Sequence, residues 1–487
     1  MRYLIAFFFS CLYFGCWSQE GTPFALMNRF NINGDAVVIG NNITSKNASK
    51  PYNDFSLLND QIRIQYIDID NNPSTFSSSS ASLNIADTNA KLVSATLFWG
   101  AVYPYEKGSK KESSTEITYQ GNDKRNSAIN EVLLTTPDGA DHQIKGNILF
   151  DGYNDEYFKE MAPYVCYSDI TSFINKDGIN GNYTVANVRA TEGYVSGGSS
   201  SGWCIFLVYE SEIASAKSIY AFKGFSYLND SEEIIAFNDF KTIEKGAVNV
   251  SIFLATLEGD GKLYRDQCAI YNPKTQGYSL LRNNLRPAKN FFTGRITVNE
   301  KINKSRIPNG QNTLGFDLLE MKIPSGLIQN NQKTTRLKMS TKSDRYYLFF
   351  TAFKVELNEV FFLNGQSVVD NDVLNSGEIE PFFKNAEIEN IEDKINEKLN
   401  TVSLNISGVE SSYYVITNVF SKESNAEKWA SMLQKRGYET GSFINPENNW
   451  HYVYVNKTED IQEAYKTYKK LAIQDYFKEI WVFKVNL

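Results

Sequence analysis

The chain has 487 residues, a formal net charge of -7, and many aromatic residues, with 29 Tyr and 32 Phe. The negative net charge argues against a nucleic-acid partner, because proteins bind nucleic acids through a basic stripe on their surface. The only two histidines, His142 and His451, lie far apart in the sequence. This separation argues against a His-rich zinc site and against a Ser-His-Asp hydrolase. The length leaves room for roughly two to four domains.

Residues 1–19 have the pattern of a secretory signal peptide. Arg2 supplies the positive n-region, and residues 4–15 form a short apolar h-region. Cleavage at the end of this stretch is the main expectation, while Cys16 leaves a lipoprotein alternative open. No later apolar run approaches the roughly 20 residues of a membrane helix. We therefore expect export across the inner membrane, to the periplasm or to the outer-membrane or cell surface.

Three cysteines follow the signal peptide: Cys166, Cys204 and Cys268. In an oxidising compartment their odd number allows one disulfide and one free thiol, with the pairing left open. Three buried free thiols are an equally good interpretation, because free cysteine behaves as a small apolar residue.

The region from residue 20 to residue 360 has an all-β pattern. Short alternating runs are separated by clusters of Asn, Gly, Ser and Asp. Length and turn spacing predict two β-sandwich domains, 20–215 and 216–360, although one large sandwich with long insertions would give the same pattern. The predicted strands are 34–39, 61–68, 92–101, 184–190, 203–209, 216–225, 248–257, 336–339 and 346–357. A helical signal covers 166–174, and Trp99 and Trp203 are expected in the core because they lie inside apolar strands.

The run 68–72 offers candidate ligands for a calcium ion. Asp68, Asp70 and Asn72 alternate along the chain and carry the oxygen ligands that calcium prefers. The run is no EF-hand, because the closing bidentate Glu of a twelve-residue loop is missing. Solvated carboxylates in a capped turn remain the favoured interpretation.

A second acidic loop contains Glu258, Asp260 and Asp266. Here too we expect solvated turn carboxylates that cap β-hairpins. A polysaccharide or peptidoglycan hydrolase would need two close carboxylates in a cleft, one of them with a raised pKa. No spacing in the sequence singles out such a pair.

Several islands in the β region follow one another in a recognisable order. They resemble a module found near the start of large bacterial surface and adhesin-like proteins, over roughly residues 68 to 357. The resemblance implies a binding or presentation scaffold rather than an enzyme. The islands are 68–81, 95–101, 169–188, 201–210, 221–225, 258–260, 315–317 and 343–344.

Residues 361–411 predict an acidic linker. Acids outnumber bases from residue 372 to residue 397, with a short helix expected at 388–399. Such a linker would tether the last domain and raise the effective concentration of a second binding event.

The C-terminal stretch 412–487 predicts a small α+β domain of β-α-β-β-α-β order, with helices on one face of an antiparallel sheet in the ferredoxin-like arrangement. The full chain is thus expected to be mainly β with a C-terminal α+β domain. The predicted elements are strand 413–420, helix 424–436, strand 438–444, strand 450–456, a second helix with its apolar stripe at 461–472, and strand 479–486.

Alternation along residues 450–455 predicts what lines the other face of this sheet. If Val453 and Val455 face the helices, then Trp450, Tyr452 and Tyr454 lie on the open side. Three aromatic residues on an exposed face favour a binding platform, because aromatic rings stack on sugars and bases.

This stretch resembles the SPOR (sporulation-related repeat) family. The matching features are the strand 413–421, the helix start at 425–427, the 433–438 segment, the run 452–455 and the Glu463-Ala464 pair. Family members bind denuded or septal peptidoglycan glycan strands through the open sheet face. The contact residues that the resemblance and the alternation together imply are Ile416, Asn418, Val419, Trp450, Tyr452, Tyr454 and Trp481.

The sequence departs from the family at two of these positions. Ile416 replaces the usual Gln, and Asn418-Val419 replaces the usual Gly-Ser. The more apolar face keeps two alternatives open: docking of an envelope protein, or packing of the aromatic residues under the linker or the upstream domain.

Together these features predict a secreted, non-enzymatic cell-envelope protein. A β-rich surface module would be tethered by a SPOR-like domain that binds peptidoglycan. The pairing resembles proteins that accompany gliding motility and type IX secretion, so a large surface adhesin or a secretion or motility component is the expected partner. No cofactor is implied apart from the candidate calcium ion. The alternatives are a SPOR-targeted hydrolase and a SPOR domain that docks a protein.

Overall fold

A computed structural model gives the fold in two compact units, Met1–Gly365 (unit 1) and Gln366–Leu487 (unit 2), each considered by itself. The predicted signal peptide, most of the predicted linker and the predicted helix 388–399 lie outside the described residues. The structure describes residues 21–113, 116–176, 178–358, 362, 402–406, 408–446, 448–472, 477 and 480–486.

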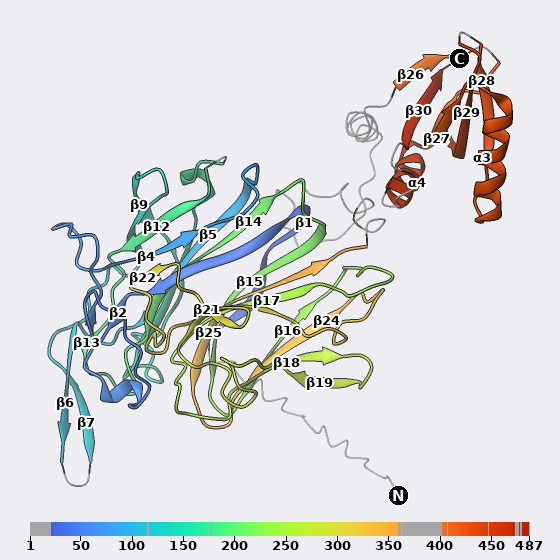
Figure 1. Ribbon diagram of the computed structural model, residues 1–487. Coiled ribbons are helices and arrows are strands. Elements are labelled where there is room, and N and C mark those ends of the chain that lie inside the picture. Colours follow the sequence, from blue (N-terminus) through green and yellow to red (C-terminus); the bar gives the residue numbers. More distant parts are fainter. Residues whose placement is uncertain are drawn as a thin grey trace, which may run out of the picture. The chain divides into compact units, whose positions relative to one another are not determined.

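Unit 1 is built on one sheet of 11 strands (Figure 1). The β-branched and aromatic runs of the sequence form most of these strands, because such side chains pack well on a pleated surface. In spatial order the strands are β10 (Asn147–Asp151), β11 (Pro163–Asp169), β5 (Lys91–Val102), β14 (Ser201–Glu210), β1 (Gly21–Asn42), β15 (Ala216–Leu228), β25 (Tyr346–Glu356), β17 (Val250–Leu257), β23 (Asp317–Lys322), β20 (Ile296–Val298) and β21 (Lys301–Ile302).

The long strand β1 joins the two halves of this sheet. Its residues 34–42 pair with β14, and its residues 21–33 pair with β15 across two register shifts. The boundary predicted between residues 215 and 216 falls between β14 and β15. Because both strands pair with β1, one continuous sheet spans that boundary.

Smaller sheets complete unit 1. The five-stranded sheet contains β22 (Arg306–Ile307), β4 (Ser78–Leu83), β12 (Gly181–Ala186), β8 (Glu131–Thr135) and β9 (Asp141–Lys145), in that order. The four-stranded sheet contains β16 (Glu232–Phe237), β24 (Thr335–Ser340), β18 (Gln267–Asn272) and β19 (Gly277–Leu280). The remaining elements are β13 (Glu192–Gly193) with β6 (Lys107–Glu112) and β7 (Ile117–Gly121), β2 (Thr44–Ser45) with β3 (Gln65–Tyr66), and the 3-10 helices η1 (Asn59–Gln61) and η2 (Thr171–Phe173).

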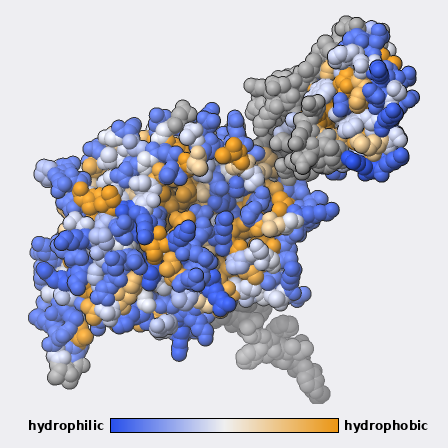
Figure 2. Space-filling model, in the orientation of Figure 1, coloured by the Kyte–Doolittle hydropathy of each residue, from blue (hydrophilic) through white to orange (hydrophobic). Residues whose placement is uncertain are grey.

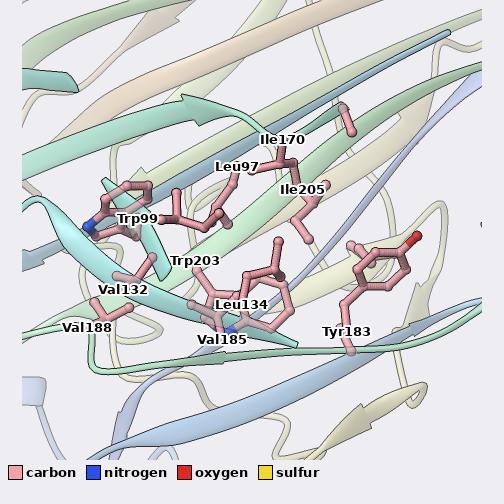
Figure 3. Close-up of a cluster of buried hydrophobic side chains, with 14 of the residues drawn as sticks. Leu97, Trp99, Val132, Leu134, Ile170, Tyr183, Val185, Val188, Trp203 and Ile205 are labelled. Carbon is pink, nitrogen blue, oxygen red and sulfur yellow. The ribbon is translucent and has the colours of Figure 1, made fainter. Parts of the chain in front are cut away.

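The first hydrophobic core lies between the large sheet and the five-stranded sheet (Figure 3). Trp99 and Trp203 are fully buried there, as predicted from their apolar strands. Each indole N–H has a partner: Trp99 donates to the carbonyl of Ile129 at 2.9 Å, and Trp203 donates to Ser79 Oγ at 2.8 Å. These bonds remove the penalty for burying a polar tip.

Two further cores follow from strand alternation. Ile252 of β17 faces a second core shared with the four-stranded sheet, whereas the next residue, Phe253, faces a third core. In that third core, Phe206 meets Phe253 at 5.4 Å between ring centroids, and Phe98 meets Phe350 at 5.0 Å. The two halves of the large sheet therefore pack against each other through aromatic residues.

The structure decides two predictions for unit 1, the helix at 166–174 and the state of the three cysteines. The helical signal at 166–174 is wrong, because residues 163–169 form β11 and pair with β5, leaving only η2. A short apolar run suits helix and strand alike, and pairing in the sheet decides between them. Cys166, Cys204 and Cys268 are all free and buried, each in a different core, so no disulfide joins them.

Unit 2 confirms the predicted β-α-β-β-α-β order, and with it the expected fold class. The strand order is β26 (Val402–Asn405), β30 (Trp481–Asn486), β27 (Ser412–Phe420), β29 (Trp450–Thr458) and β28 (Gly441–Asn445). The helices α3 (Glu423–Lys435) and α4 (Ile461–Ala472) bury Leu433 and Ile461 against Val415 and Val482 of the sheet. Among the described residues, no helix is long and apolar enough to cross a membrane.

Strand β26 was not predicted, since residues 361–411 were expected to be a linker. It pairs parallel with β30 and extends the sheet by one strand at that edge. A segment of only four residues without an apolar run gives little indication of a strand in the sequence. Here β30 supplies the hydrogen-bond partners of the β26 backbone.

Candidate functional site

The face of the unit 2 sheet that lies opposite the helices carries most of the predicted contact residues. Register shifts in β27 place Ile416 opposite Tyr454 and Val419 opposite Tyr452. Trp481 pairs with Ile416 from the other side. Asn418 instead pairs with Val453, and its Oδ1 accepts a hydrogen bond from the N–H of Val419 at 2.8 Å.

The centre of this face is a packed aromatic cluster. Phe443 stacks on Tyr452 with ring centroids 5.1 Å apart and planes 3° apart. Tyr414 meets Tyr454 edge-on at 5.0 Å. Tyr452 is only 9% exposed and Ile416 is fully buried. The predicted platform is thus closed over at its centre.

One end of the face remains accessible. Trp450 is 48% exposed, and Val419 and Trp481 are half-buried. Because β27 ends at Phe420 while β29 and β30 begin at Trp450 and Trp481, these three side chains belong to the same end of the antiparallel sheet. This end offers aromatic and apolar surface to a ligand.

The sequence analysis missed three aromatic members of the cluster: Tyr414, Phe443 and Phe483. Their signal was present, because alternation along β27, β28 and β30 puts each on the same side as Tyr452. It could have been found by extending the alternation argument from one strand to all four.

The candidate calcium ligands are engaged in a turn. Asp68 Oδ1 accepts a hydrogen bond from Ser78 Oγ at 2.9 Å, and Asp70 Oδ1 accepts one from Thr75 Oγ1 at 2.9 Å and one from the N–H of Asn72 at 2.9 Å. In the part of the chain that the structure describes, no group of three or more His, Cys, Asp or Glu side chains is placed to hold a metal ion.

The second acidic loop is buried, so the expectation of solvated carboxylates is wrong there. Glu258 is 4% exposed, Asp260 5% and Asp266 0%, and they gather with Asp344, which is 1% exposed. Backbone N–H groups replace water as their partners. Asn59 donates to Asp260 Oδ2 at 3.1 Å, and the N–H of Asp260 donates to Asp344 Oδ2 at 3.3 Å.

Burial raises the pKa of these carboxyls, because a charge without water is unfavourable. The pKa of Asp344 rises to about 9, with burial as the first cause and the nearby Asp266 as the second. The pKa of Glu258 rises to about 8 despite the opposing effect of Arg345, and that of Asp266 rises to about 7. Raised carboxyl pKa values suit a general acid, whereas the deep burial of these carboxyls limits their contact with a substrate.

A second buried feature, missed by the sequence analysis, is the ion pair between Arg286 and Asp317. Arg286 Nη1 donates to Asp317 Oδ1 at 2.7 Å, and both side chains are essentially inaccessible to solvent. Arg286 Nε also donates to Thr297 Oγ1 at 2.9 Å, while Asp317 Oδ2 accepts from the N–H of Gly294 at 2.7 Å. These hydrogen bonds satisfy the buried pair and hold the neighbouring loops together.

Comparison with known proteins identifies the C-terminal unit. Residues 410–480 match the SPOR domain family, so the chain contains a C-terminal SPOR domain. SPOR domains bind peptidoglycan in the cell envelope. No curated protein matches the chain.

Three solved structures that align with this chain have similarly low identities and TM-scores. BuGH86wt in complex with neoagarooctaose is 9% identical over 56% of this chain and 35% of that chain, with a TM-score of 0.18. The infectious bursal disease virus Gt strain structure is 10% identical over 69% and 72%, with a TM-score of 0.17. The major capsid protein P2 from bacteriophage PM2 is 13% identical over 57% and 97%, with a TM-score of 0.15. Scores this low carry no argument about fold or function.

Proposed function

We propose that this protein is a secreted, non-enzymatic component of the bacterial cell envelope. Its SPOR domain binds peptidoglycan glycan strands, and its β-rich unit binds or displays another surface component. The observation that carries the proposal is the SPOR match over residues 410–480, together with an exposed Trp450 on the face opposite the helices.

The accessible end of the face has the chemistry of a sugar-binding surface. The indole of Trp450 is half exposed, with Val419 and Trp481 contributing apolar surface at the same end of the sheet. Pyranose rings present C–H groups that stack on aromatic faces, and such stacking contributes about 1–3 kcal/mol per ring by analogy with bases. Ile416, which differs from the Gln that the SPOR resemblance implies, affects the packing of the sheet more than contact with a ligand, because it is fully buried.

A non-enzymatic role is supported by the state of the acidic cluster. Its four carboxyls are at most 5% exposed, and a substrate bond must come within hydrogen-bond reach of a catalytic acid. The surface of unit 1 shown in Figure 2 is mainly hydrophilic, with apolar residues in small separate patches. Such a surface suits a displayed scaffold.

We further propose that the protein works beside a large surface adhesin, in gliding motility or type IX secretion. Support comes from the ordered islands over residues 68–357 that resemble modules of surface proteins, combined with a domain that anchors to the cell wall. Anchoring would hold the β-rich unit close to its partner and raise their effective concentration.

The experiment is a pull-down of the full-length protein on purified peptidoglycan sacculi, with and without amidase treatment to remove stem peptides. Wild type is compared with Trp450→Ala and with Tyr264→Ala, a matched control in unit 1 whose ring is 62% exposed. We expect amidase treatment to increase retention, Trp450→Ala to reduce it about tenfold or more, and Tyr264→Ala to leave it unchanged.

Two outcomes would count against the proposal. Absence of retention by folded wild-type protein would refute glycan binding and favour a protein partner for the same face. Equal retention of wild type and Trp450→Ala would show that glycan, if bound, is held elsewhere on the molecule.

A further inference from the structure

The segment before β27 lies on the glycan-binding face itself. Ile406 is 4% exposed and belongs to the aromatic cluster with Tyr414, Tyr452 and Phe483. Val409 packs against the same cluster. We call residues 406 and 408–411 the flap. The flap follows β26, the strand that extends the sheet beyond β30.

Polar contacts hold the flap at several points. The hydroxyl of Tyr414 donates to the carbonyl of Glu410 at 2.9 Å, and Glu410 forms an ion pair with Lys457 of β29. Ser411 Oγ donates to the carbonyl of Val485 at 3.1 Å. Three neighbouring strands, β27, β29 and β30, thus contribute contacts to one short segment.

The polar contacts of the flap lie at one end of the face. Tyr414 and Val485 lie near the start of β27 and the end of β30, where the flap is anchored. Trp450 and Trp481 begin their strands at the opposite end. A glycan strand crossing the whole face would have to occupy the space that Ile406 and Val409 fill.

We propose that the flap is an autoinhibitory cover that competes with glycan for this face, an inference that rests on the proposed function of the SPOR domain. With the flap closed, a ligand reaches only the end marked by Trp450. Opening the flap exposes Phe443 and Tyr452 and completes the binding surface. The apparent affinity is then reduced by the fraction of molecules whose flap is open.

Among the described residues, the contacts that hold the flap include one buried Ile, one partly buried Val, two hydrogen bonds and one ion pair to a Lys that is 33% exposed. Removing the two apolar side chains should therefore open the flap without unfolding the sheet, because the helix-side core is formed by other residues.

The test compares full-length wild type with the double variant Ile406→Ser/Val409→Ser on amidase-treated sacculi, measured as an apparent Kd by depletion. The control is Ile234→Ser, an apolar residue 42% exposed on β16 in unit 1 rather than in the SPOR domain. We expect the double variant to bind at least tenfold more tightly than wild type and the control to match wild type. Thermal melting verifies that each variant is folded.

A labelling experiment keeps the proposal falsifiable if the double variant does not fold. In a chain beginning at Glu20, the three remaining cysteines are buried, so Val409→Cys introduces a single thiol that the closed flap partly buries. We expect soluble denuded glycan to increase its rate of maleimide labelling severalfold. Unchanged or slower labelling on glycan binding would overturn the flap proposal.

The outcomes separate the two proposals. If wild type binds glycan and the folded double variant binds equally or more weakly, the flap proposal is overturned while the proposed function stands. If neither wild type nor the folded double variant binds, the proposed function fails, and the flap proposal fails with it.

Discussion

The buried acidic cluster predicts that unit 1 becomes less stable as pH rises. The pKa of Asp344 is about 9 in the folded protein and that of Asp266 about 7, against about 4 for an Asp in an unfolded chain. A carboxyl whose folded pKa exceeds its unfolded pKa holds its proton more tightly in the native state. Its stabilising effect is complete below about pH 4 and is lost as pH rises towards the folded pKa.

The size of the stability loss follows from the pH range between the unfolded and the folded pKa of the carboxyl. Each pKa unit corresponds to about 1.4 kcal/mol, so Asp344 alone should lower the free energy of unfolding by on the order of 4 kcal/mol between pH 5 and pH 8. The substitution Asp344→Asn keeps the shape and an oxygen that can accept the N–H of Asp260, but cannot ionise. We expect the variant to be more stable than wild type at pH 8 and to show a flatter pH profile.

The assay is urea unfolding of the full-length protein at pH 5, 6, 7 and 8, followed by the fluorescence of the buried indoles of Trp99 and Trp203. Asp230→Asn is the matched control, because Asp230 lies in a turn with φ 51° and its side chain is 70% exposed. Wild-type stability that is flat from pH 5 to pH 8, or Asp344→Asn destabilised equally at every pH, would refute the reasoning. Either result would mean that Asp344 is ionised and compensated in the native state.

Two substitutions and one labelling measurement test the packing of unit 1. Asp317→Asn leaves Arg286 buried without its partner at 2.7 Å, and we expect a loss of about 3–5 kcal/mol in urea unfolding, unlike a change to an exposed pair. Gly202→Ala would place a Cβ 2.5 Å from the ring of Phe316, and a loss of about 1–3 kcal/mol is expected; an unchanged melting temperature would contradict this. The three free cysteines, whose thiol pKa values burial raises, should react with Ellman's reagent at pH 8 only after unfolding, so stoichiometric reaction of any one in the native protein would be inconsistent with the structure.

Local patterns in the sequence predicted the features that local chemistry controls. The helices and strands of unit 2 follow from apolar spacing, and the burial of Trp99 and Trp203 follows from their place in apolar strands. Alternation placed Tyr452 and Tyr454 on one side of β29, and the register confirms that they share a cluster with Ile416.

Long-range contacts account for what the sequence did not reveal. The N–H that satisfies Asp260 comes from Asn59, 201 residues away in the sequence, so no local pattern could show that this acidic loop is buried. Strand β1 pairs with both β14 and β15, a double role that its own residues do not encode. The exposure of the aromatic face likewise depends on the flap, whose contacts arise only once the sheet has formed.

Ile416 gives the most direct link between the departures from the SPOR pattern and the flap. It is fully buried in the cluster that Ile406 joins, at a position where the resemblance to the SPOR family implies Gln. Ile416→Gln would bury an amide among apolar groups while the flap is closed, at a cost of about 1–3 kcal/mol for unsatisfied polar atoms. Opening the flap would return the amide to water, so we expect this substitution to lower the melting temperature of unit 2 modestly and to tighten binding to denuded glycan.

The combination of effects makes this substitution informative. If the flap were a fixed part of the sheet, Ile416→Gln would destabilise unit 2 without any gain in glycan binding. If the amide were simply accommodated, neither stability nor binding would change. Only a flap in equilibrium between closed and open states links lower stability to tighter binding, because the same buried amide disfavours the closed state alone.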